Sequence, residues 1–127
     1  LVPGDPLTVG PRVAAWLKVL ARYRLATAST RYAGLVGRRY TSLAIRDTRS
    51  RWGSCSPDGR LMYSWRLILA PPPVLDYVAA HEVAHLVELN HSPAYWRVVS
   101  DICPDWKRHR DWLKANGSVL HGLRFQD

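Results

Sequence analysis

Apolar residues recur with two different periods along this chain, and the period changes near residue 40. From Arg12 to Leu25 they recur every three or four positions, with Arg and Lys mostly between them. This spacing predicts an amphipathic helix that packs one face on a core. Gly34 and Gly37 leave open whether the helix continues through residues 26–39. Residues 1–11 hold three prolines and two glycines and predict an extended lead-in.

Residues 40–70 predict a small antiparallel sheet. Extended segments begin near Tyr40 and over residues 49–55, and Ser-Pro-Asp-Gly at 56–59 is a strong turn sequence. From Leu61 to Leu69 every second residue is apolar or aromatic, which is the period of a strand with one buried face. Three prolines at 71–73 end this strand, because proline cannot donate to a ladder.

The last third of the chain predicts three helices. Residues 74–89 are apolar on nearly every side, which is typical of a helix in the centre of a fold. Ser92 as N-cap and Pro93 in the first turn predict a helix over 93–102. A third helix from Pro104 to Ala115 is expected to end at Asn-Gly 116–117, leaving 118–127 as a C-terminal tail. At 127 residues, the chain is predicted to form one α+β domain.

Charge is distributed unevenly along the chain, whose net charge is +8. Residues 1–66 hold 12 Lys and Arg against 3 Asp, whereas residues 67–127 hold 6 Lys and Arg against 7 acidic residues. Most of the basic residues are Arg, whose planar fork suits phosphate and carboxylate groups. A nucleic-acid partner is one interpretation of the basic half. A solvated basic surface in an Arg-preferring proteome is the other.

Composition also bears on the compartment. No apolar run approaches the roughly 20 residues that span a bilayer, and the N-terminus lacks the layout of a signal peptide. Cys55 and Cys103 are too few for a disulfide framework. They predict two thiols in a reducing cytoplasm, with a single disulfide or a metal role as alternatives. We therefore expect a cytoplasmic protein without a membrane partner.

The predicted central helix carries the sequence His-Glu-Val-Ala-His at 81–85, and His91 follows after five residues. Two histidines four apart lie on one helix face and can share a metal ion. His91 lies at a turn between two helices, where the chain can direct a third ligand to that face. We predict Zn²⁺ held by His81, His85 and His91, with a fourth position left for water whose pKa falls to about 7. Glu82 would act as the general base that takes the proton of this water.

Other residues near the motif have weaker predicted roles. Glu88 is expected to be a nearby or surface carboxylate rather than a ligand. Tyr63, Tyr95 and His109 are candidates for stabilising the oxyanion, although His109 and His121 are more readily interpreted as surface residues. The strand over 60–68 is hypothesised to pair with an extended substrate. The tail 118–127 is hypothesised to fill the cleft of a latent peptidase.

Four further segments accompany the metal motif: Ser-Arg-Trp-Gly-Ser-Cys-Ser at 50–56, Ser-Trp-Arg-Leu-Ile-Leu-Ala-Pro at 64–71, Asp-Tyr-Val at 76–78 and Asn-His-Ser-Pro at 90–93. Together they resemble the YgjP-like metallopeptidases, related to the SprT-like and Wss1-like zinc proteases, over about residues 12–117. The resemblance implies a compact zincin-type catalytic domain with the same three His ligands and Glu82 as base. Ser64 departs from the family pattern, which often has Asn there, and a β-rich N-terminal extension is largely absent.

Two functions follow from these observations. The leading prediction is a zinc-dependent metallopeptidase that acts on proteins or peptides. Relatives in the SprT and Wss1 branch act on proteins bound or crosslinked to DNA, so the resemblance also implies DNA-associated substrates. The alternative is a basic nucleic-acid-binding module with a structural or latent zinc site. The sequence does not indicate an oligomeric state.

Overall fold

The structure is a computed structural model that describes residues 8–125. In chain order the elements are β1 (Thr8–Val9), α1 (Pro11–Val36), β2 (Ser42–Arg46), β3 (Gly53–Cys55), β4 (Arg60–Ser64), the 3-10 helix η1 (Trp65–Leu69), α2 (Pro72–Ala84), α3 (Pro93–Ile102), α4 (Trp106–Gly122) and β5 (Arg124–Phe125). The predicted α+β class is confirmed. Both cysteines are free thiols. No helix within residues 8–125 is long and apolar enough to cross a membrane.

The three-stranded sheet is mixed rather than antiparallel, and its order is β2-β4-β3. β4 pairs in parallel with β2, for example Leu43 with Leu61, and antiparallel with β3, for example Ser54 with Met62. The prediction was wrong for β2 and β4, because alternation identifies strands but not their neighbours. Residues 47–52 carry the chain past the position that β4 later fills.

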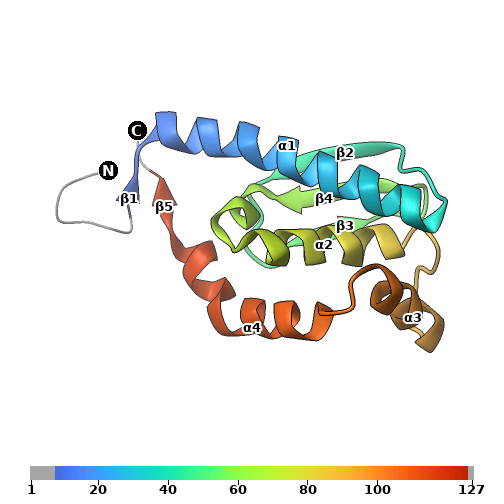
Figure 1. Cartoon of the computed structure of the whole chain (residues 1–127). Coiled ribbons are helices and arrows are strands. Elements are labelled where there is room, and N and C mark those ends of the chain that lie inside the picture. Colours follow the sequence, from blue (N-terminus) through green and yellow to red (C-terminus); the bar gives the residue numbers. More distant parts are fainter. Residues whose placement is uncertain (1–7, 126–127) are drawn as a thin grey trace.

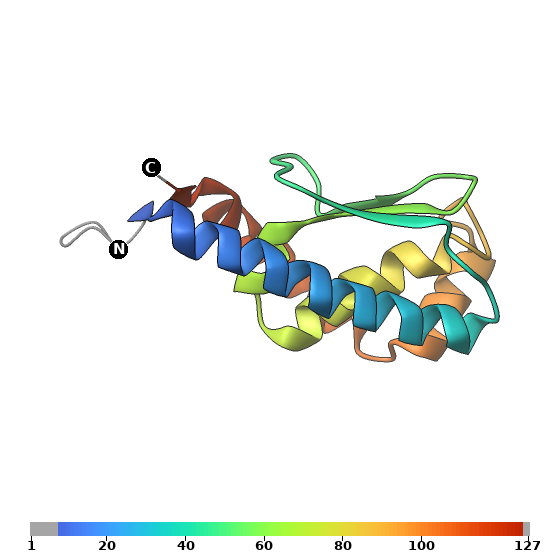
Figure 2. The same cartoon turned by 90° about the horizontal axis from the view of Figure 1, so that it is seen from above.

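Helices α1 and α2 pack against the same side of the sheet (Figures 1 and 2). The α1 helix continues through Gly34 and ends at Gly37, whose φ of 69° is the left-handed conformation that a helix stop requires. As predicted, α2 is central, since its residues are almost all buried. The sheet contributes the side chains of Leu61 and Tyr63 to this core.

Three predicted boundaries were wrong. The strand predicted over 61–69 ends at Ser64, whose hydroxyl accepts from the backbone N–H of Arg66 and begins η1. Helix α2 ends at Ala84 instead of residue 89, and the backbone tightens into turns over 85–88. Helix α4 runs through residues 116–117 and ends at Gly122, so the predicted tail is helical as far as Gly122. Its last described residues form β5, which pairs with β1 (Figure 1).

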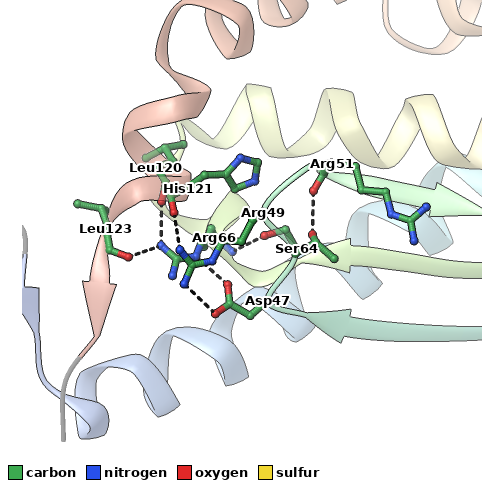
Figure 3. A network of polar contacts seen from close by, with 9 residues as sticks. Asp47, Arg49, Arg51, Ser64, Arg66, Leu120, His121 and Leu123 are labelled. Carbon is green, nitrogen blue, oxygen red and sulfur yellow. Dashed lines mark hydrogen bonds and ion pairs between the residues drawn. The ribbon is translucent and has the colours of Figure 1, made fainter.

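Arg66 attaches the end of α4 to the sheet (Figure 3). Only 1% of this side chain is exposed. Its guanidinium donates to the carbonyls of Leu120 and Leu123 at 2.9 and 2.6 Å, and to the Asp47 carboxylate at 2.8 Å. The last carbonyls of a helix have no partner within the helix, so Arg66 satisfies groups that burial would otherwise leave unpaired.

Candidate metal centre and active site

The structure brings His81, His85 and His91 together. Their donor nitrogens all lie within 4.8 Å of one another, and the Nε2 atoms of His85 and His91 are 3.1 Å apart. His81 lies in the last turn of α2, His85 is the residue that caps this helix, and His91 lies in the loop before α3. These are the three residues that the sequence predicted as ligands. Cys55, for which a metal role had been an alternative, is not part of this donor cluster.

The loop that carries His91 is fixed by the start of α3. The Ser92 hydroxyl accepts from the Tyr95 backbone N–H at 3.2 Å, and Pro93 occupies the first turn, as predicted. The Tyr95 ring stacks on His85 with ring centroids 4.4 Å apart, and its hydroxyl donates to the His81 carbonyl at 2.7 Å. The ring of Tyr95 also lies edge-on to His91, with centroids 4.9 Å apart, so Tyr95 contacts all three histidines.

In His81 and His85, the Nδ1 atom of the ring has a polar partner of its own. His85 Nδ1 lies 3.1 Å from the Glu88 carbonyl, which can only accept, so Nδ1 carries the proton and Nε2 is the unprotonated nitrogen that faces the other histidines. The Tyr77 hydroxyl lies 3.5 Å from His81 Nδ1. Burial, together with the charges of His85 and His91, lowers the pKa of His81 to about 4, and burial also lowers the pKa of His85. At neutral pH both rings are uncharged, which is the state that binds a metal ion.

Glu82 lies beside this cluster and is 6% exposed. Burial raises the pKa of its carboxyl group to about 8, against a smaller lowering by Arg51. The backbone of Gly53 in β3 passes directly over it. A Cβ added to Gly53 would lie 3.0 Å from Glu82 Cγ and 3.1 Å from Glu82 Oε2. Glycine at position 53 is therefore what lets the edge of the sheet approach the carboxylate this closely.

The three histidines and Glu82 line a cleft of about 280 Å³. One wall is β3, with Gly53, Ser54 and Cys55, and Leu89 lies at its margin. β3 is bonded to β4 on one side only, whereas β4 has strands on both sides. The hypothesis that the strand over 60–68 pairs with a substrate is therefore wrong. Among the described strands, β3 has the free edge that faces the cleft.

The other candidate residues have different positions from those expected. Tyr63 is fully buried and its hydroxyl bonds to Ser29 Oγ at 2.8 Å, so it is directed into the core. His109, expected at the surface, is 9% exposed because it shares the inner face of α4 with Trp106 and Leu113. His121, also expected at the surface, stacks on Trp52. Glu88 contributes its backbone carbonyl to the site.

Comparison with known proteins gives the family. The family model for the YgjP-like metallopeptidase domain matches residues 2–116. The chain belongs to this family. As a YgjP-like metallopeptidase it hydrolyses peptide bonds, and the family implies a metal ion that the three histidines could bind. A search of curated proteins finds no match.

One solved structure supports the fold of this YgjP-like domain. The metallopeptidase zymogen of Pyrococcus abyssi abylysin superposes with a TM-score of 0.65 at 19% sequence identity. The match covers 72% of this chain and 93% of that one. At this identity the likeness concerns the fold, and it agrees with the four α-helices and small mixed sheet of the described residues.

Two residues of the site were not predicted as part of it, and a third was predicted in a different role. Gly53 approaches Glu82, Tyr77 faces His81, and Tyr95 supports His81 and His85 rather than an oxyanion. Tyr77 could have been found from its position four residues before His81, one helical turn away on the same face. Gly53 gave no such signal, because its contact with Glu82 depends on how the sheet packs on α2.

Proposed function

We propose that this protein is a zinc-dependent endopeptidase in which His81, His85 and His91 hold Zn²⁺ and Glu82 is the general base. The observation that carries this proposal is the convergence of three imidazole nitrogens beside one buried carboxyl group. A set of three neutral imidazoles fits the catalytic type of zinc site, which keeps one position open. The two free thiols agree with a reducing cytoplasm.

In the proposed mechanism, the three histidines, Glu82 and strand β3 have separate roles. A divalent cation held by the three rings would supply Lewis acidity toward water and toward a peptide carbonyl. Glu82 accepts the proton of the attacking water and returns it to the leaving amine. Burial raises the pKa of this carboxyl group without a metal, and a cation held by the adjacent histidines would lower it again and favour the carboxylate that accepts the proton. The free edge of β3 holds an extended substrate by backbone hydrogen bonds across the cleft.

Replacing Glu82 by Gln tests this assignment. Cleavage of a denatured protein substrate should fall by about 10²- to 10⁴-fold, as expected for loss of a general base. Zinc content, measured by mass spectrometry of the folded protein, should not change. Asp101→Asn on the exposed side of α3 serves as the matched control and should retain activity. Wild-type protein that binds no zinc, or Glu82→Gln protein with full activity, would refute the proposal.

We also propose that the basic half of the chain binds nucleic acid, so that DNA-associated proteins become substrates. The supporting observation is that α1 contains no acidic residue, while Arg12, Arg22 and Arg24 are exposed along it. Binding of a DNA duplex should weaken steeply with salt, since each neutralised phosphate releases counterions. The double substitution Arg22→Gln and Arg24→Gln should reduce that slope. A salt-independent affinity, or none, would contradict this second proposal.

A further inference from the structure

A second cavity adjoins the metal cleft behind Glu82. Its volume is about 220 Å³, and its lining consists of Trp52, Gly53, Tyr77, Val78, His81, Glu82 and Leu113. Gly53, His81 and Glu82 line both this cavity and the cleft. A peptide bond placed for attack beside Glu82 therefore has the mouth of this cavity next to it. The side chain that precedes or follows the bond is the part of a substrate that can enter.

The walls of the cavity are mostly apolar. Beyond the shared wall they are formed by the indole of Trp52, the side chains of Val78 and Leu113, and the ring of Tyr77. An apolar cavity of about 150 Å³ is large enough to hold a benzene molecule, whereas pockets for whole small ligands measure about 300–1,000 Å³. The size therefore fits one side chain.

The position of the Trp52 wall is set by the last turns of α4. The backbone of Gly117 lies so close that an added Cβ would be 3.3 Å from Trp52 Cζ2. The ring of His121 stacks on the indole, with centroids 3.8 Å apart and an interplanar angle of 12°. His121 is held in turn by Arg49, which donates to its carbonyl at 3.0 Å (Figure 3). Gly117 and His121 lie beyond residue 116, where the family match ends.

We propose that this cavity is the main specificity subsite of the peptidase and takes one apolar side chain, of the size of Leu, Met or Phe, next to the scissile bond. Leu113 sets its depth. His121 is a positioning residue that acts through Trp52. The proposal rests on the peptidase function proposed above, because the two cavities share the residues at which cleavage would occur.

A binding experiment tests the subsite without turnover. Zinc-loaded Glu82→Gln protein is titrated by calorimetry with Ala-Ala-Phe-Ala-Ala and with penta-alanine. The Phe peptide should bind at least about tenfold more tightly, because one additional methylene group in an apolar pocket already changes discrimination by about tenfold or more. Adding Leu113→Phe should remove the difference. The same substitution at Leu35, which is 65% exposed on α1, should leave it unchanged.

Because Leu113 is buried, a second substitution at this position separates an effect on the cavity from an effect on folding. Leu113→Ala enlarges the cavity and should shift the preference from the Phe peptide to one with a central Trp. Equal affinity of the Phe peptide and penta-alanine for the parent protein would overturn the subsite. So would a preference that neither Leu113 variant alters.

Cleavage products separate the subsite from the peptidase function. Mass spectrometry of a digested protein mixture should show apolar residues enriched at one position beside the cleaved bond. His121→Ala should reduce the ratio of kcat/KM for Phe over Ala peptides at least about tenfold. If cleavage depends on Glu82 but shows no side-chain preference, the subsite proposal is wrong and the peptidase function stands. If the Phe peptide binds more tightly than penta-alanine but no cleavage depends on Glu82, the proposed function is wrong and the subsite stands.

Discussion

Gly53→Ala should reduce catalysis without removing the metal site. The new Cβ would lie 3.0 Å from both Glu82 Cγ and the Met62 carbonyl oxygen, against an optimal separation of about 3.5–4.0 Å between carbon atoms. The Met62 carbonyl belongs to β4, which is bonded to strands on both sides, so it cannot readily move. The Glu82 side chain must therefore shift by a few tenths of an ångström.

Two magnitudes follow from this shift. Overpacking of this kind destabilises a fold by about 1–3 kcal/mol, which urea unfolding would measure. Misplacement of a reacting group by about 1 Å can reduce the rate about 100-fold, so this smaller shift should lower kcat/KM on a peptide substrate by roughly three- to tenfold. Zinc affinity, measured by competition with a chelating dye, should stay at the wild-type value. The three atoms nearest to the added methyl group belong to Glu82 and Met62 rather than to a histidine.

Gly34→Ala is the matched control. Position 34 lies within α1, and a Cβ there would meet nothing within 4 Å. Activity should be unchanged, and the helix should gain about 0.5–1 kcal/mol because alanine loses less entropy than glycine. If Gly53→Ala retains kcat/KM within about twofold of wild type, the argument from the close approach of β3 is wrong.

Further predictions concern the supports of the site and the end of α4. Ser92→Ala should lower the free energy of unfolding by about 1 kcal/mol, measured in urea, because the N-cap of α3 is lost. Removing metal with a chelator should lower the melting temperature, since zinc at about 1,000 times its Kd adds about 4 kcal/mol; an unchanged melting temperature would count against a bound metal. Although partial burial opposes it, the hydrogen bond and charge of Arg66 lower the pKa of Asp47 below its ordinary 3.8. The Asp47 carboxylate therefore stabilises the fold fully above its ordinary pKa, and this stabilisation is lost as the pH falls through the lower pKa of the folded state. In acid-unfolding curves, the difference in unfolding free energy between wild type and Asp47→Asn should accordingly become smaller below pH 4. Arg66→Met should cost about 3 kcal/mol in unfolding free energy, because the buried carbonyl of Leu120 and the partly buried carbonyl of Leu123 lose this donor, and a loss under about 0.5 kcal/mol would refute that role.

The site was predictable where local sequence determines geometry. His81 and His85 share a helix face by spacing alone, and Ser92 with Pro93 fixes the start of α3, so the position of His91 followed. The buried nature of α2 was also readable, because its apolar residues leave no polar face.

The predictions that were wrong concern features that depend on contacts between distant segments. Alternation over residues 40–70 could not show that β4 lies between β2 and β3. An Asn-Gly pair normally ends a helix, but here Gly117 is needed where α4 meets Trp52, and Asn116 donates from its side chain to the Trp112 carbonyl. Gly53 belongs to the same class, since only the packing of β3 on α2 gives it a role.

The pairing of β1 with β5 places Thr8 beside Arg124 and Val9 beside Phe125, at the end of the molecule opposite α3 (Figure 1). A larger polypeptide that contained this domain as an insert would therefore enter and leave it at one point. Partners tethered at that point would approach the cleft only across the length of the domain. The effective concentration of a tethered substrate at Glu82 would then depend on linker length, so linkers of different length would select different substrates for the same cleft.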